Sequence, residues 1–218
     1  MSKKIKIQAP KISKILEETI DVIDDMYDEE LIEDKLIQNT LIEGIIDCRV
    51  RLSSCIFRNV TFESCDFSKI DMTDVVFENC NLSNISFSDS GIYRIEFKNC
   101  KLIGSRFDDS ILKSVVFKEC LGKYSNFSFS KFKGVKFEDC DFEGAVFQEV
   151  ENESLEIENT NLCESVFSGT SLKDIDFTTS SIYGIEVRIP DIAGGIFSME
   201  QRIRLVGSFF LPLLFYTI

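Results

Sequence analysis

The sequence predicts an all-β fold, a single four-sided parallel β-solenoid, and two periodicities lead to this prediction. From Leu52 to Phe197, 28 of the 30 residues spaced by five are apolar, and 16 of the 20 Phe residues fall in this register, in a chain that is 44% hydrophobic overall. Phe and aliphatic residues also alternate with a period of twenty residues. Neither period matches the roughly 3.6 residues of a helix or the roughly 2 of a strand, and a short fixed repeat is typical of a solenoid.

Each five-residue unit has two inward positions. The residue two positions before each large apolar residue is mostly small or β-branched, from Cys55 to Val150, and the other three positions are mostly polar. Inward residues five apart require the backbone to turn once per unit, so four quarter turns return the chain to its starting direction. Coils stacked by strand pairing lie about 4.8 Å apart, and the repeat is long enough for about seven or eight coils.

The twenty-residue period places like residues above one another in columns. Two opposite columns are almost entirely aromatic and the two between them are mainly aliphatic, so that they can fill a narrow prism without voids. The aromatic columns are Phe67, Phe87, Phe107, Phe127, Phe147 and Phe167, and Phe57, Phe77, Phe97, Phe117, Phe137, Ile157, Phe177 and Phe197.

Two residues interrupt the large inward position. At Gly122 we expect a gap that Leu121 or Tyr124 fills, and at Asn152, in a charged stretch, we expect a local bulge. Stacked amides can hydrogen-bond along a ladder, so the outward Asn residues one coil apart are interpreted as structural. These are Asn59, Asn79 and Asn99.

The units resemble those of the pentapeptide-repeat family, which read roughly Ala-(Asp/Asn)-Leu-x-x or Cys-x-Phe-x-x. Matching units include those that begin at Cys65 (Cys-Asp-Phe-Ser-Lys), Cys80 (Cys-Asn-Leu-Ser-Asn) and Cys140 (Cys-Asp-Phe-Glu-Gly), and the resemblance covers about 150 of the 218 residues. Family members form right-handed quadrilateral β-helices. The resemblance therefore implies this fold for residues 31–197.

The N-terminal end of a solenoid needs a cap, because its strand edge and core would otherwise meet water. Residues 1–30 are predicted to form a capping helix, since apolar residues over Lys11–Tyr27 have helical spacing and acidic residues lie opposite. Residues 31–50 keep the five-residue spacing of apolar residues but lack the small inward residue of each unit. They are predicted to form one imperfect coil, whose register the sequence does not determine. The apolar helix residues are Ile12, Ile15, Leu16, Ile20, Ile23 and Met26.

Residues 198–218 are predicted to form a short C-terminal helix, with Ser198 as its cap, followed by an apolar segment. The spacing of Gln201, Leu205 and Gly207 resembles the C-terminal helix of the fluoroquinolone-resistance branch of the family (the Qnr and MfpA type), whose members dimerise tail to tail. The resemblance implies a homodimer through the C-terminus, and an apolar run of this size favours a buried interface over a simple cap. The predicted dimerisation residues are Ile203, Leu205, Val206, Phe209, Phe210, Leu211, Leu213, Leu214 and Phe215.

The sequence contains little that points to chemistry. Six of the eight Cys occupy the small inward position, where free Cys packs as a small hydrophobe, and the ladder from Cys80 to Cys140 is too parallel for good disulfide torsions. Cys163 falls on an outward position. Because there is no His, no Cys-x-x-Cys pair and no glycine-rich phosphate loop, we expect no catalytic residue, no metal and no cofactor, and a protein that is not an enzyme.

The ends of the chain predict a cytoplasmic protein. Lys3, Lys4 and Lys6 are not followed by an apolar stretch long enough for a secretory signal, and free thiols fit a reducing compartment. The apolar tail at 205–218 is interrupted by Gly207 and Pro212 and is shorter than the roughly twenty residues that span a bilayer. We therefore expect no membrane anchor.

Charge is unevenly distributed along the chain, whose net charge is −13. Residues 94–136, the basic band, carry ten Lys or Arg against four acidic residues, whereas residues 137–191 carry two against fourteen. The face with the Phe57–Phe197 column bears an acidic stripe, interpreted either as a solvated face or as a partner surface; the basic band could hold an acidic partner. The stripe residues are Glu119, Glu138, Asp139, Glu156, Glu158 and Asp176.

The resemblance to the Qnr and MfpA branch implies a function. Members of that branch are proposed to mimic DNA and to occupy the DNA-binding saddle of DNA gyrase or topoisomerase IV. It implies that this chain is a DNA-mimicking dimer that protects such an enzyme from quinolones, of the type without coil-interrupting loops. A general protein-interaction scaffold for another partner is the alternative, and direct nucleic-acid binding is not expected at this net charge.

Overall fold

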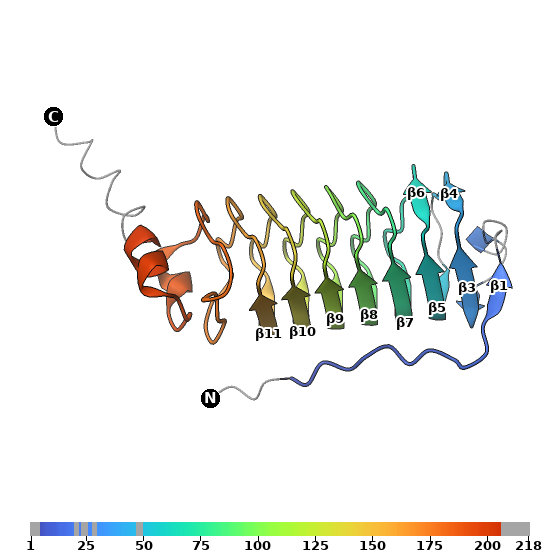
Figure 1. Ribbon diagram of the computed structural model, residues 1–218, viewed down its shortest axis with the longest axis horizontal. Coiled ribbons are helices and arrows are strands. Elements are labelled where there is room, and N and C mark those ends of the chain that lie inside the picture. The colour runs from blue at the N-terminus through green and yellow to red at the C-terminus, as the bar shows by residue number, and fades with distance from the viewer. Residues whose placement is uncertain (1–4, 20–21, 23–25, 28–29, 47–49, 206–218) are drawn as a thin grey trace.

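The structure, a computed structural model, describes residues 5–19, 22, 26–27, 30–46 and 50–205. The chain forms a rod of stacked coils (Figure 1), and its parallel strand pairing confirms the predicted β-solenoid. One long sheet takes strands from seven successive coils. Phe77 is paired with Phe97, and Phe97 with Phe117, so each coil advances the chain by the predicted twenty residues.

The strands are short and lie mostly on one side of the rod. The long sheet contains β1 (Glu17–Thr19), β2 (Leu31–Glu33), β3 (Lys35–Gln38), β5 (Arg51–Arg58), β7 (Asp71–Glu78), β8 (Gly91–Lys98), β9 (Ile111–Lys118), β10 (Lys131–Glu138) and β11 (Glu151–Glu158). A second sheet pairs β4 (Leu41–Glu43) with β6 (Thr61–Glu63). Elsewhere the coils are linked by isolated parallel bridges, such as Ser86 with Arg106. A 3₁₀ helix, η1 (Ile189–Ile192), follows the last full coils.

Residues 31–46 form the imperfect first coil, and the structure settles its register. Leu31 is paired with Arg51 and Leu36 with Ile56, again twenty residues apart. Ile32, Ile37 and Ile42 are therefore the inward residues of this coil, and all three are buried.

The turn in each unit occurs at one position. All described residues with positive φ have numbers that end in 4 or 9. Asn, Asp and Gly adopt this left-handed conformation more readily than other residues, which explains their frequency at these corners. The predicted Asn ladder is confirmed: Asn99 Nδ2 donates to Asn79 Oδ1 at 2.8 Å, and Asn79 Nδ2 donates to Asn59 Oδ1 at 3.1 Å.

The two aromatic columns form the core as predicted. The ring of Phe117 stacks nearly parallel on Phe97 and Phe137, with centroids 5.0 and 4.8 Å apart. Its edge meets Phe107 and Phe127 of the opposite column, each at 5.8 Å. Both geometries are favourable for aromatic pairs, and Phe117 is completely buried.

The expectation at Gly122 is wrong in its detail. A Cβ at Gly122 would lie 2.2 Å from Cε1 of Phe142, so the ring of Phe142 from the next coil occupies the gap. Leu121 and Tyr124, which were expected to fill it, are 45% and 65% exposed. The reason is that Phe142 is an inward residue and already points into the core, whereas Leu121 and Tyr124 point outward and would need to reverse direction.

The bulge predicted at Asn152 is confirmed. The pairing of β10 with β11 shifts register beside Asn152, which lies opposite Phe132 in the large inward position. Asn152 Oδ1 is buried, and it has no hydrogen-bond partner among the described residues.

Replacing Asn152 with Leu should therefore raise the free energy of unfolding by about 1–2 kcal/mol, since the change removes a buried unpartnered oxygen and adds apolar contacts. Urea denaturation measures it. Asn126→Leu is the matched control and should destabilise, because Asn126 Oδ1 accepts hydrogen bonds from the Ser128 backbone and hydroxyl. A less stable Asn152→Leu protein would contradict this account of the bulge.

The predicted N-terminal helix is wrong over residues 5–19. Those residues are not helical, and β1 pairs in parallel with β3, with Glu17 opposite Lys35. The reason is that the first coil has an open strand edge, whose backbone groups a strand can satisfy and a helix cannot. Met26 and Tyr27 are helical, and Val22 and Met26 are buried against the core. Other parts of the predicted helix, at 1–4, 20–21, 23–25 and 28–29, lie outside the described residues.

The short helix predicted at the C-terminal end is confirmed over residues 199–205. Ser198 caps it: its Oγ accepts from the Gln201 backbone N–H at 3.2 Å, and Gln201 Oε1 accepts from the Ser198 N–H at 2.8 Å. This reciprocal pair is a capping box. Gln201 Nε2 also donates to the carbonyl oxygens of Phe177 and Ser180, each at 2.9 Å, so the helix closes the last coil.

Candidate partner-binding surface

The solenoid brings the six residues of the predicted acidic stripe onto one face. Glu156 lies in β11, Glu138 ends β10, and Glu158 lies opposite Glu138 in the paired strand. The other three extend the stripe along the rod axis. Glu119 and Asp139 are exposed corner residues with φ of 54° and 55°, and Asp176 is an exposed residue of the following coil.

The middle of the stripe is not a free negative surface. Glu138 forms ion pairs with Lys118, at 2.6 Å, and with Lys136, which also contacts Glu158 at 2.9 Å. Hydrogen bonds from Lys118 and Lys136 lower the pKa of Glu138. Glu138 is thus neutralised by its neighbours, whereas Glu119 and Asp139 project into solvent at corners.

The predicted basic band is also largely neutralised. Eight of its ten Lys and Arg residues form ion pairs, and several partners lie one coil further along. They are Arg94, Lys98, Arg106, Lys118, Lys123, Lys131, Lys133 and Lys136. Lys113 instead lies 4.8 Å from the centre of the Tyr93 ring. The band is therefore less suited to hold an acidic partner than its composition suggests.

Sequence analysis missed this pairing although the signal was present. A Lys followed twenty residues later by Glu occurs at Lys118, Lys123, Lys131 and Lys133. Twenty residues is the coil period, so the two side chains lie above one another. Lys131 and Glu151 are 3.1 Å apart, and Lys133 and Glu153 are 2.9 Å apart.

A hollow of about 250 Å³ opens beside the C-terminal part of the stripe. Leu155, Ile157 and Lys136 are among the residues that line it. Four carboxylates also line it: Glu156, Glu158, Asp174 and Asp176. Such a group of carboxylates attracts a cationic group, and an Arg or Lys side chain of a partner fits that chemistry. No group of side chains suited to hold a metal ion occurs in the described part of the chain.

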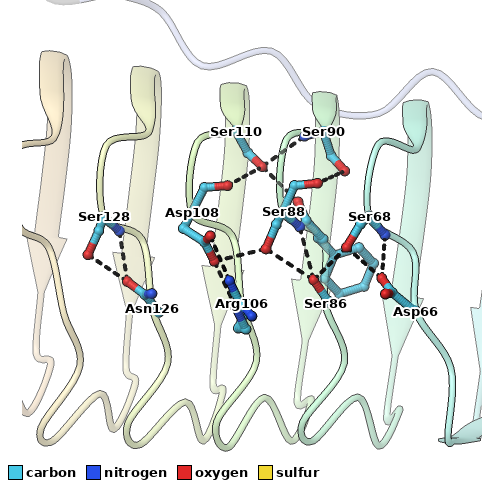
Figure 2. Close-up of polar contacts among 11 residues, drawn as sticks. Asp66, Ser68, Ser86, Ser88, Ser90, Arg106, Asp108, Ser110, Asn126 and Ser128 are labelled. Atoms are coloured by element: carbon cyan, nitrogen blue, oxygen red, sulfur yellow. Dashed lines mark hydrogen bonds and ion pairs between the residues drawn. The ribbon is translucent and has the colours of Figure 1, made fainter.

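A second polar cluster, on another side of the rod, is internally satisfied (Figure 2). Arg106 donates twice to Asp108, and Ser88 Oγ donates to Asp108 Oδ1 at 2.8 Å. Burial by itself raises the pKa of Asp108, but the bonds from Arg106 and Ser88 outweigh it, so that this pKa is lowered. The network continues through Ser86 and Ser68. It links neighbouring coils and leaves little capacity for a ligand.

The described residues at the C-terminal end separate into two groups. Ile203 is 66% exposed on the helix, whereas Leu205 is 8% exposed and packs onto the last coil. Leu205 therefore acts as a cap in the single chain. The remaining predicted dimerisation residues lie outside the described residues: Val206, Phe209, Phe210, Leu211, Leu213, Leu214 and Phe215.

The cysteines within the described ranges show no catalytic arrangement. All seven within the described ranges are free, and six of them are buried. In the ladder, Cys100 Sγ donates to the carbonyl oxygen of Phe77 at 3.3 Å and Cys120 Sγ to that of Phe97 at 3.3 Å. Burial raises the pKa of Cys55 and Cys120, which disfavours the reactive thiolate.

No helix in the described ranges is long and apolar enough to cross a membrane.

Comparison with known proteins gives a family match and several structural likenesses. A family model described as a pentapeptide repeat region matches residues 50–127, 70–147 and 91–167, which together exceed half of the chain. Full-length QnrB1, a plasmid-mediated fluoroquinolone resistance protein, is similar with 15% identity and a TM-score of 0.45, over 80% of this chain and 99% of that chain.

Two further solved structures are similar. A pentapeptide repeat protein from the thylakoid lumen of Arabidopsis thaliana has 23% identity and a TM-score of 0.31, over 57% of this chain and 73% of that one. HetL, a pentapeptide repeat protein from the cyanobacterium Nostoc involved in heterocyst differentiation regulation, has 13% identity and a TM-score of 0.23, over 76% and 91% of the two chains. A search of the curated proteins found no match.

Proposed function

The chain belongs to the pentapeptide-repeat family, and from this premise we propose that it is a non-catalytic, DNA-mimicking homodimer that binds a type II topoisomerase and protects it from quinolones. The observation that carries the proposal is the alignment of stripe carboxylates along one face of a rod. Glu138 is paired in register with Glu158, and Glu119 and Asp139 occupy the same corner in successive coils.

The stripe repeats negative charge along the rod, as a DNA mimic requires. Its six carboxylates lie in four successive coils, so a coil spacing of about 4.8 Å places one carboxylate per about 3.2 Å along the rod, against one charge per about 1.7 Å along duplex DNA. Because Lys118 and Lys136 neutralise Glu138, and Lys136 also forms an ion pair with Glu158, the contact surface lies at the other stripe carboxylates. These are Glu119, Asp139, Glu156 and Asp176.

Dimerisation would place these surfaces together. Residues 137–191 hold fourteen acidic residues and directly precede the C-terminal helix. Two chains joined at their C-termini would therefore form a central acidic saddle flanked by the largely neutralised basic bands. The basic DNA-binding groove of DNA gyrase or topoisomerase IV is complementary to such a saddle.

Gyrase supercoiling in the presence of ciprofloxacin tests the proposal. The protein should restore supercoiling at micromolar concentration, and light scattering should give the mass of two chains. The proposal would be contradicted if light scattering showed a strict monomer, or if the protein neither restored nor inhibited supercoiling.

A protein-interaction scaffold for a different partner is the second candidate, and exposed apolar residues away from the stripe favour it. Leu121, Tyr124 and Phe129 are 45%, 65% and 54% exposed, and DNA mimicry makes no use of them. A Tyr124→Ser, Phe129→Ser protein distinguishes the two candidates. It should protect gyrase fully if the stripe is the contact surface, and loss of protection would show that these exposed apolar residues belong to the contact surface.

A further inference from the structure

Residues 5–16, here called the strap, run along the outside of the rod and cross the coils from β10 toward β1 (Figure 1). The strap crosses a single line of corner residues, here called the strap column. The column consists of Ser54, Asp74, Arg94, Ser114 and Gly134. The sequence pattern predicted a helix over much of this segment, so an extended contact along several coils was not expected.

Three contacts hold the strap at separate coils. The Lys11 backbone N–H donates to Asp74 Oδ1 at 2.8 Å, and the Ser13 N–H donates to Ser54 Oγ at 2.9 Å. Near the other end, side-chain atoms of Ile5 and Ile7 lie 3.3 and 3.5 Å from the point where a Cβ of Gly134 would stand. Side-chain acceptors thus hold the backbone of the strap, and a glycine leaves room for its apolar side chains.

The strap column differs from the other corners of the rod. Ser54 and Asp74 are each 8% exposed and Ser114 is 2% exposed, whereas corner residues elsewhere, such as Tyr124 and Phe129, are mostly exposed. Within the column, Arg94 forms a bidentate ion pair with Asp74 of the preceding coil. The strap therefore covers the column where it crosses it, and the covered residues Ser54 and Asp74 are polar.

The spacing of the column suits any extended chain. Gly134 and Asp74 are three coils apart, or about 14 Å, and the four residues from Ile7 to Lys11 span about 13 Å when extended. No bulge or turn is needed, so the strap follows the rod with about four residues for every three coils. An extended peptide of the same pattern would meet the same contacts.

Charge complements this geometry. The first sixteen residues contain five Lys and no acidic residue, so the remaining chain carries a net charge of −18 where the whole carries −13. Lys6, Lys11 and Lys14 are exposed, while Ile5, Ile7 and Ile12 are half-buried. A cationic strand thus lies on a rod of net negative charge, and Asp74 is the carboxylate that it contacts, at Lys11. Ile5, Ile7 and Ile12 are the apolar side chains that the rod half-buries, whereas Ile15 is exposed.

We propose that the strap column is a binding surface for an extended, lysine-rich peptide with alternating apolar residues, and that residues 5–16 are its tethered ligand. The same segment supplied as a separate peptide occupies the column when the tethered copy is removed. The surface is independent of the acidic stripe, so the proposal stands or falls separately from gyrase protection.

Binding in trans tests the proposal. A chain lacking residues 1–16 is titrated into a fluorescein-labelled peptide of residues 1–16, and anisotropy is recorded. We expect saturable binding that weakens at least tenfold when Ile5 and Ile7 of the peptide are replaced with Ser, and no binding to the full chain, whose column is occupied. Absence of binding to a folded truncated chain, or equal binding of both peptides, overturns the proposal.

A matched pair of variants locates the site. Gly134→Asn places a side chain in the seat of Ile5 and Ile7, and Gly44→Asn is its control, because both glycines have positive φ, near 77°, and nothing lies within 4 Å of a Cβ at Gly44. Asn is common at these corners, so both should fold. In the truncated chain, Gly134→Asn should weaken peptide binding at least tenfold and Gly44→Asn should not.

Hydrogen exchange on the full chain decides the question if truncation prevents folding. The Lys11 and Ser13 amides should exchange at least tenfold faster in Gly134→Asn than in Gly44→Asn, since the strap loses its seat. Equal exchange in the two variants would show that the column does not hold the strap and would overturn the proposal.

Discussion

Replacing Phe117 with Ala should lower the free energy of unfolding by about 3–5 kcal/mol, the usual cost of removing a large buried aromatic side chain. Phe117 is completely buried in the middle of its column. Its ring stacks on Phe97 and Phe137 and meets two rings of the opposite column edge-on. Backbone pairing fixes the coils about 4.8 Å apart, so neighbouring coils cannot collapse into the cavity. Guanidinium denaturation measures the loss.

Phe129→Ala is the matched control for this prediction. Phe129 belongs to the same coil, but it occupies a corner with φ of 60° and is 54% exposed. Its replacement should change the free energy of unfolding by less than about 0.5 kcal/mol. Equal losses in the two variants would mean that the aromatic columns are not the main source of stability.

Reversing two stripe charges, with Glu119→Lys and Asp139→Lys in one chain, should raise the concentration needed to protect gyrase at least tenfold. Both residues are exposed corners one coil apart with φ near 55°, and Lys69 already adopts a similar conformation, with φ of 65°. The backbone can therefore accept the change. The variant presents positive charge to a basic groove, where like charges in contact are costly. Supercoiling with ciprofloxacin is the readout.

The control separates the position of charge from its amount. Asp89 and Asp109 are also exposed corners one coil apart, with φ of 57° and 58°, on a different side of the rod. Asp89→Lys with Asp109→Lys makes the same change in net charge and should leave protection nearly intact. Equal loss in both double variants would indicate that net charge, and not the stripe, carries the effect.

The regular part of the fold could be predicted because every inward position repeats. The five-residue register places Phe117 inside, and the twenty-residue register places it on Phe97, with no need for long-range information. The corner position could not be assigned, although Asn and Asp at residues ending in 4 or 9 point to it. The prediction of which side chain fills the gap at Gly122 was wrong for a related reason. The ring that fills it is that of Phe142, which belongs to the next coil.

The ends were predicted less well, because tertiary contacts decide them. Lys11–Tyr27 has helical spacing, but the open edge of β3 offers hydrogen bonds that only a strand can use, and Glu17 pairs there. Within the candidate surface, the six stripe residues do share one face. Their neutralisation by Lys118 and Lys136 depends on side chains from neighbouring coils, which composition alone does not reveal.

Displacement of a labelled DNA duplex from DNA gyrase tests the central claim most directly, because a DNA mimic must compete for the groove that holds DNA. The wild-type protein should release the duplex at micromolar concentration, less effectively as salt rises, and the Glu119→Lys, Asp139→Lys variant should need at least tenfold more. A duplex that stays bound at saturating wild-type protein, or equal displacement by the two proteins, would contradict the account.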